Sequence, residues 1–177
     1  MLRCRAMRLN EVILDENGLN DAVISRGSLS RLFDVALLVS GNQVAVFRGD
    51  GVIVSTPTGS TAHALAAGGP IIHPTLDSLL ICPICPHTLT MRPILLPPQE
   101  KIILVISSQA QGIGLTVDGQ VYADLQFSDR VEISVSDVRL KLIRAGVRDF
   151  YSTIHDKLGW GGNPRYSSDG PPCGWRP

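Results

Sequence analysis

The residues best suited to ligand chemistry lie in a polar loop near the middle of the chain. Residues 56–61, Thr-Pro-Thr-Gly-Ser-Thr, separate a β-branched run at 52–55, which predicts a strand, from small residues that predict a helix capped by Ser60 or Thr61. The first N–H groups of a helix have no partner within it and carry partial positive charge, so they suit an anion or a polar ligand. A plain structural role for this strand, loop and helix is the open alternative.

Two features beside the loop favour a ligand role. The predicted helix carries Ala62, Ala64 and Ala66, whose small side chains leave room for a flat group close to the backbone, and it ends at Gly68-Gly69-Pro70. Gly49-Asp50-Gly51, before the strand, predicts a turn because glycine accepts backbone angles that other residues avoid.

The elements that must hold this loop are mostly short strands. Asn17-Gly18, Ser40-Gly41-Asn42 and Asp118-Gly119 predict hairpin turns, and Pro83 confines its strand to an edge or a sharp turn. Closely spaced strands with turns between them predict a mainly β, two-sheet, sandwich-like fold. The expected strands cover residues 7–14, 19–25, 34–39, 43–47, 52–55, 79–84, 101–107, 115–117, 120–125, 130–135 and 139–143.

The composition fits one β-rich domain. Charged residues make up 18% of the 177, below the roughly 25% typical of soluble domains, and the formal net charge is zero. The low charged fraction indicates surface meant for a neighbouring domain or subunit, or simply an apolar β domain. Without a basic stripe, nucleic acid is not an expected partner. Apolar runs such as residues 102–106 are far shorter than the ~20 residues of a membrane helix, so no membrane partner is expected.

The ends of the chain look different from its middle. Residues 1–6 are expected to be a disordered start and 161–177, rich in Gly, Pro and Ser, a disordered tail, with one domain at 7–160 between them. Asp149 can cap a final helix that carries Phe150, Ile154 and Leu158 on one face. No apolar stretch follows the basic first residues, so no signal peptide is visible and a cytoplasmic location is expected.

Four cysteines could suggest metal or disulfide chemistry. Cys82, Cys85 and His87 have part of a zinc spacing, but a structural zinc site needs a second ligand pair, and Cys4 and Cys173 lie in weak terminal segments. No βαβ pattern surrounds the Cys-Pro-Ile-Cys run, which disfavours a thioredoxin-like site. Free thiols are the simplest interpretation, and no metal site is expected in this chain.

The central stretch also resembles a known family. Residues 49–62, Gly-Asp-Gly-Val-Ile-Val-Ser-Thr-Pro-Thr-Gly-Ser-Thr-Ala, are similar to the second signature of NAD kinases, which lies in their C-terminal domain. The resemblance continues through residues 68–71, 85–89, 92–93 and 117–120. It closes at Lys157-Leu158-Gly159-Trp160, which resembles the end of bacterial members, and so covers about residues 7–160.

The resemblance implies a fold and an activity. The fold is the two-sheet C-terminal domain of the NAD kinase and diacylglycerol kinase-like group, with a short helix after the loop at 56–61 and a helix near the C-terminus. The activity is transfer of a phosphoryl group from ATP, or from polyphosphate, to the 2′-hydroxyl of the adenosine ribose of NAD, giving NADP. A divalent cation, Mg²⁺ or Mn²⁺, and a homo-oligomer are implied as well. Lipid kinases share the architecture, but the Thr-Pro-Thr-Gly-Ser-Thr-Ala loop argues against them.

The resemblance also implies binding residues for NAD. Of two Asn-acid pairs, Asn20-Asp21 lies thirty residues before Asp50, the spacing of the family, whereas Asn10-Glu11 lies forty before it. We therefore expect Asn20 and Asp50 to be the polar jaws of one nucleoside pocket. His63 stands where the family most often has tyrosine. The histidine keeps a flat ring but lacks the phenol hydroxyl. The full set is Asn20, Asp21, Arg31, Arg48, Asp50, Thr61, Ala62, His63, Ala64, Leu65, Ala66 and Gln120.

The catalytic aspartate is the exception. In the family it belongs to a Gly-Gly-Asp-Gly motif of an N-terminal α/β domain, and Gly49-Asp50-Gly51 is the only Gly-Asp-Gly in this sequence. Because the second signature's strand and loop follow it, this tripeptide is not the catalytic motif. We expect no catalytic residue in these 177 residues and a chain that is inactive alone. An inactive dinucleotide-binding or subunit-association module is the alternative.

Overall fold

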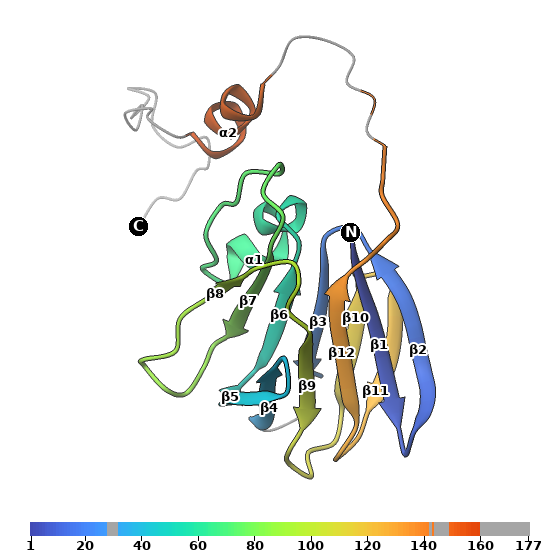
Figure 1. Ribbon diagram of the computed structural model, residues 1–177. Coiled ribbons are helices and arrows are strands. Elements are labelled where there is room, and N and C mark those ends of the chain that lie inside the picture. Colours follow the sequence, from blue (N-terminus) through green and yellow to red (C-terminus); the bar gives the residue numbers. More distant parts are fainter. Residues whose placement is uncertain (28–31, 142, 144–148, 160–177) are drawn as a thin grey trace, which may run out of the picture. The chain divides into compact units, whose positions relative to one another are not determined.

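The computed structural model describes residues 1–27, 32–141, 143 and 149–159. The chain divides into two compact units, Met1–Lys141 and Leu142–Pro177. Two six-stranded antiparallel sheets make up the first unit (Figure 1). One sheet has the order β2 (Glu11–Gly18), β1 (Leu2–Arg8), β12 (Arg130–Val135), β9 (Ile102–Ile106), β4 (Phe33–Val39), β5 (Asn42–Gly49). The other has the order β11 (Val121–Leu125), β10 (Ile113–Val117), β3 (Asp21–Arg26), β6 (Gly51–Ser55), β7 (Leu79–Ile84), β8 (Ile94–Leu96).

The first sheet buries one face. In β9, Ile102, Leu104 and Ile106 have no exposed surface, while Ile103 and Val105 between them are half-buried. This is the period-2 alternation of a strand with one face on the core. The inward side chains of both sheets form one hydrophobic core, which confirms the two-sheet fold expected from the sequence.

β6 in the second sheet is buried on both faces. Val52 and Val54 belong to the core between the sheets. Ile53 points the other way and packs with Ala64 of the short helix α1 (His63–Ala66) in a second, smaller cluster. Figure 1 shows β6 between β3 and β7, with α1 near its end. Coverage on both faces explains why residues 52–54 read as a continuous apolar run.

The start of the chain corrects two expectations. Residues 1–6 are not disordered, since β1 pairs with β12 from Leu2↔Val135 to Met7↔Arg130. The strand expected at 7–14 is instead interrupted by a turn at Leu9 and Asn10, both with positive φ. Inward Leu2, Cys4 and Ala6 alternate with outward arginines, and that alternation was the missed strand signal.

Asn17-Gly18 is not a hairpin turn, because β2 ends at Gly18 and the chain crosses to the second sheet, where β3 pairs with β10 and β6. The hairpins at Ser40-Gly41 and Asp118-Gly119 are confirmed, and all four of these residues have the positive φ of a tight primed turn. The pairing of β8 with β7 stops at Ile81, so β7 is an edge strand at Pro83, as expected.

Two expectations concern the end of the chain. The described residues of 139–143 lie outside any strand, so the strand expected there is wrong. Asp149 does cap α2 (Phe150–Leu158), because its side chain accepts a hydrogen bond from the Ser152 N–H at 2.6 Å, which also lowers the pKa of its carboxyl. The tail expected at 161–177 falls outside the described residues. Within the described ranges, no helix is long and apolar enough to cross a membrane.

The core between the sheets should control stability. Leu104→Ala removes a side chain with no exposed surface and should lower the free energy of unfolding by about 2–5 kcal/mol. Val138→Ala removes a half-exposed side chain outside the strands and should change it by less than about 0.5 kcal/mol. Urea unfolding followed by circular dichroism measures both, and equal losses would contradict this core.

Candidate functional site

The polar loop after β6 is tied to the segment that precedes β3. The Thr56 N–H donates to the Asn20 carbonyl at 2.9 Å, and the Thr56 hydroxyl donates to the Leu19 carbonyl at 2.6 Å. The same hydroxyl accepts from the Gly59 N–H at 3.1 Å, so one side chain fixes the loop and the neighbouring strand start together. Sequence reasoning named the loop for its helix start and missed this role of Thr56.

Gly59 lets the loop approach Asn20. A Cβ on Gly59 would lie 2.1 Å from the Asn20 carbonyl oxygen and 2.6 Å from its Cα, closer than real atoms pack. Because glycine has only a hydrogen at this position, its backbone can touch that of Asn20, 39 positions earlier in the sequence.

The helix expected after the loop is shorter than the sequence suggested. A 3-10 turn, η1 (Thr58–Thr61), is followed by α1 of only four residues, and neither has a side-chain cap. Ser60 instead donates to the Pro57 carbonyl at 2.7 Å and accepts from the Ile72 N–H at 3.0 Å. The expectation of a helix capped by Ser60 or Thr61 is therefore wrong, and so short a helix carries little dipole.

Asp118 grips the other side of the Asn20 segment. Its carboxylate accepts hydrogen bonds from the backbone N–H groups of Leu19 at 2.7 Å, Asn20 at 2.7 Å and Asp21 at 3.0 Å. Sequence reasoning used Asp118-Gly119 as a turn signal and as part of the family resemblance, and nothing in the spacing pointed to a contact 98 residues away.

Asp21, His63 and Asp118 bring titratable side chains together at this end of the sheet. Asp21 is only 5% exposed, and burial raises the pKa of its carboxyl. The nearby His63 opposes that rise, and the Asp118 carboxylate adds to it. The buried Asp21 carboxyl and the exposed His63 imidazole lie next to an apolar cluster, in which Ala64 of α1 packs with Val23, Ile53 and Leu80.

Most of the residues predicted to bind NAD gather at this end. Asn20, Asp21, His63 and the α1 residues flank the loop, and Gln120 follows Asp118 in its turn, where its N–H donates to the Val117 carbonyl at 3.0 Å. Ala64 differs from its neighbours because it is fully buried against Ile53, so its side chain is part of the core. Thr61, Ala62, His63 and Ala66 are exposed and Leu65 is half-buried.

Asp50 and Arg48 lie at the opposite end of β6. Thr56 is level with Asn20, and Asp50 precedes Gly51, which pairs with Ser25 at the far end of β3. The six residue steps from Asp50 to Thr56 span about 20 Å along the strand. The expectation that Asn20 and Asp50 are jaws of one nucleoside pocket within a single chain is therefore wrong. Antiparallel pairing of β3 with β6 is the reason. Asn20 precedes β3 and Asp50 precedes β6, and in an antiparallel pair the two strands start at opposite ends.

Asp50 has its own partner there. Its carboxylate accepts from the Arg26 Nε at 2.7 Å, and the Asp50 carbonyl accepts from the Arg26 N–H at 3.1 Å. Arg48 lies 3.8 Å from the Asp34 carboxylate. Arg31, also predicted to bind NAD, lies outside the described residues.

The described residues contain no group of three or more His, Cys, Asp or Glu side chains that could hold a metal ion. Cys82 is buried beneath α1, with its sulfur 3.5 Å from the Ala67 carbonyl, whereas Cys85 is exposed.

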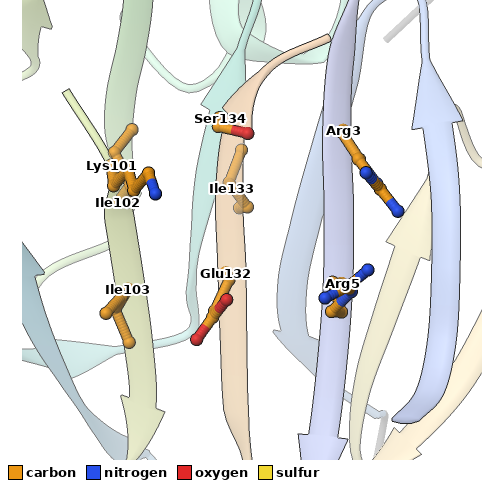
Figure 2. A pocket seen from close by; sticks show the side chains of 8 residues that line it. All are labelled: Arg3, Arg5, Lys101, Ile102, Ile103, Glu132, Ile133 and Ser134. Carbon is orange, nitrogen blue, oxygen red and sulfur yellow. The ribbon is translucent and has the colours of Figure 1, made fainter. Parts of the chain in front are cut away.

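A hollow of about 350 Å³ lies elsewhere, on the outer face of the first sheet (Figure 2). Arg3 and Arg5 project from β1 beside it, and both bind Asp15 of β2 at 2.8–3.1 Å. None of the residues predicted to bind NAD lines this hollow, so the candidate site remains at the loop.

The fold and the loop define a class of protein: a two-sheet domain in which a buried strand runs into a Thr-Pro-Thr-Gly turn that is hydrogen-bonded to the segment before an Asn-Asp pair. The sequence model of the ATP-NAD kinase C-terminal domain matches residues 19–145, and the chain belongs to that family. The match begins at the Leu19 connection and includes the loop, Asp50 and Asp118.

Curated relatives agree with the family match. The chain is 40% identical over 161 residues to the NAD kinase of Geobacter metallireducens, covering 91% of this chain and 57% of that protein. It is 45% identical over 144 residues to the NAD kinase of Trichlorobacter lovleyi, covering 81% of this chain and 50% of that protein. The chain thus spans about half the length of these relatives.

Solved structures agree on the fold. Yeast NADH kinase complexed with NADH superposes with a TM-score of 0.83 at 28% identity, over 94% of this chain and 51% of that one. The NAD kinase of Archaeoglobus fulgidus in complex with ATP gives a TM-score of 0.63 at 28% identity, over 77% of this chain and 51% of that one.

The close approach at Gly59 yields a test of the loop. Gly59→Ala should lower the melting temperature and shift the amide resonance of Asn20, because the new methyl must displace the Asn20 backbone. Gly27→Ala is the matched control, since its nearest contact is a backbone oxygen at 3.3 Å. An Asn20 resonance that moves no further in Gly59→Ala than in the control would contradict the loop geometry.

Asp21 yields a pH test. Because its folded pKa is raised, the native state holds its proton longer than the unfolded chain does, and stability falls as pH rises from the ordinary carboxyl value of 3.8 through the raised one. Asp21→Asn should remove this loss, so the stability of the variant relative to the parent should grow across that window. Urea unfolding at a series of pH values measures the difference, and a difference that stays constant across the window would contradict the burial cost.

Proposed function

We propose that this chain is the dinucleotide-binding part of an NAD kinase, which phosphorylates the 2′-hydroxyl of the adenosine ribose of NAD to give NADP. The observation that carries the proposal is the lock on Asn20-Asp21 by Thr56, Gly59 and Asp118, found in a chain that belongs to the ATP-NAD kinase C-terminal domain family. A backbone held in this way, with an amide and a carboxylate side chain near an imidazole, suits recognition of a nucleoside.

The chemistry of each group supports a role toward NAD. The Asn20 amide can both donate and accept, and the Asp21 carboxylate accepts from hydroxyl or amide groups. His63 is exposed at the start of α1, where its ring can pack against a base. Exposed Thr61, Ala62 and Ala66 keep the neighbouring surface shallow. Gln120 adds an amide from the turn that carries Asp118.

Asp50 and Arg48 would serve a different part of the ligand surface. Since they lie about 20 Å from Asn20 along β6, they can meet the same dinucleotide only if it extends along the sheet, or if a second copy of the chain supplies them. A homo-oligomer of the kind expected from the sequence would allow the second arrangement. Arg26 holds Asp50 with one oxygen of its carboxylate engaged, which leaves the other for a ribose hydroxyl.

The chemical step needs groups that these residues do not gather. Phosphoryl transfer from ATP depends on positioning, on charge neutralisation by a divalent cation such as Mg²⁺ or Mn²⁺, and on a carboxylate that takes the hydroxyl proton. The described residues offer no metal cluster, and Mg²⁺ is commonly held through substrate phosphates with few protein ligands. We therefore propose that this chain orients NAD and is inactive alone. Under the alternative, it is a dinucleotide-binding or subunit-association module in a protein without kinase activity.

Binding tests the proposal directly. NAD should raise the melting temperature of the purified chain more than ATP does, because a ligand that binds only the folded state stabilises it. Asn20→Ala should weaken NAD binding at least about tenfold by calorimetry, since it removes a polar partner of the ligand. Lys101→Ala, just before β9 at the outer hollow, is the control and should bind NAD as the parent does. Equal shifts with NAD and ATP, or none, would favour a purely structural role.

Activity gives an independent test. With NAD, ATP and Mg²⁺, the chain alone should form no NADP above background in a coupled dehydrogenase assay. Measurable turnover would show that a catalytic base lies within these 177 residues and would overturn the division of labour proposed here.

A further inference from the structure

We propose that Asp118 is a positioning residue for the dinucleotide site: it holds the Leu19-Asn20-Asp21 backbone so that the Asn20 and Asp21 side chains face the ligand. The identity of the ligand, a dinucleotide, rests on the proposed function. The hold itself is a property of the chain that can be measured without any ligand.

The first argument comes from the chain path. β2 ends at Gly18 in the first sheet and β3 begins at Asp21 in the second, so Leu19 and Asn20 alone make the crossing. Residues that cross between sheets lose the regular ladder partners of a strand, and an unpaired buried N–H group is costly. The Asp118 carboxylate supplies acceptors for Leu19, Asn20 and Asp21 together, at 2.7, 2.7 and 3.0 Å.

The second argument is that the opposite side of the crossing is already fixed. The carbonyl groups of Leu19 and Asn20 accept from Thr56 and Ser55, and Gly59 packs directly on Asn20. With both sides bonded, the Asn20 backbone has one position. Without Asp118 it would be held on its carbonyl side only, and its side chain would lose a fixed direction.

The third argument is that two demands select the residue type at position 118. Its φ of +52° lies in the left-handed region, where Asp, Asn and Gly are the residues best tolerated. Acceptance of three N–H groups at two oxygens requires a carboxylate, because Asn has one acceptor oxygen and Gly has none. Hydrogen bonds to a charged acceptor are also stronger than neutral ones. Aspartate alone meets both demands.

Two substitutions separate the hold from the turn. Asp118→Gly keeps the positive φ and should preserve the β10–β11 hairpin while removing every acceptor. Asp118→Asn also tolerates that φ and keeps one acceptor oxygen. Ile133→Val is the control for general stability, since it trims a buried side chain of β12 away from this crossing.

Hydrogen exchange of the ligand-free full chain tests the hold. Exchange at the amides of Leu19, Asn20 and Asp21 should be about tenfold faster or more in Asp118→Gly and intermediate in Asp118→Asn. The Gln120 amide, which donates to Val117 across the turn, should keep its protection in both. Unchanged exchange at 19–21, or equal acceleration in Ile133→Val, would overturn the proposal.

NAD binding tests the positioning. The dissociation constant for NAD, measured by calorimetry well below the melting temperature, should rise about tenfold or more in Asp118→Gly and less in Asp118→Asn, and stay unchanged in Ile133→Val. Recovery by Asn, although Gly is the better turn residue, distinguishes positioning from turn stability. Faster exchange with unaltered NAD affinity would overturn the positioning role. A parent chain that binds no NAD would instead overturn the proposed function, while the exchange data would still decide the hold.

Discussion

The site depends on one constraint: two residues, Leu19 and Asn20, carry the chain from the first sheet to the second. So short a crossing cannot complete its own hydrogen bonds, so side chains from distant segments complete them. Asp118 supplies acceptors to its N–H groups, and Thr56 and Ser55 supply donors to its carbonyls. Polar residues of the segments that resemble the family thus form hydrogen bonds within the chain itself. The Asn20-Asp21 backbone is therefore held on both sides. In the proposed function, the side chains of these two residues contact the dinucleotide.

Burial of β6 on both faces gives this arrangement its foundation. The strand ends at Ser55 with no exposed surface, and the loop that follows can be held in one place because its anchor cannot move. Gly59 then sets the distance of closest approach to Asn20. A buried carboxylate at Asp21 is the cost of the site, since burial raises its pKa and works against folding at neutral pH.

The same strand pair also divides the polar residues into two groups. One end of β3 and β6 carries Asn20, Asp21 and α1, and the other carries Arg26 and Asp50. A dinucleotide has two nucleosides, and a surface with two polar ends separated by a strand length suits a long ligand or a site shared between copies. Arg3 and Arg5, which line the outer hollow, form ion pairs with Asp15. This hollow contains none of the polar residues at either end of β3 and β6.

The sequence by itself determined the two-sheet fold, two of its hairpins, the capped final helix and the family, because alternation, turn residues and capping act over a few neighbouring positions. It did not reveal β1, the crossing at Gly18, the shortness of α1 or the distance between Asn20 and Asp50. Those follow from which strands pair, and pairing is decided by burial over the whole core. Asp118 shows the difference most clearly: its turn is local chemistry, whereas its hold on Asn20 exists only once β10 lies beside β3.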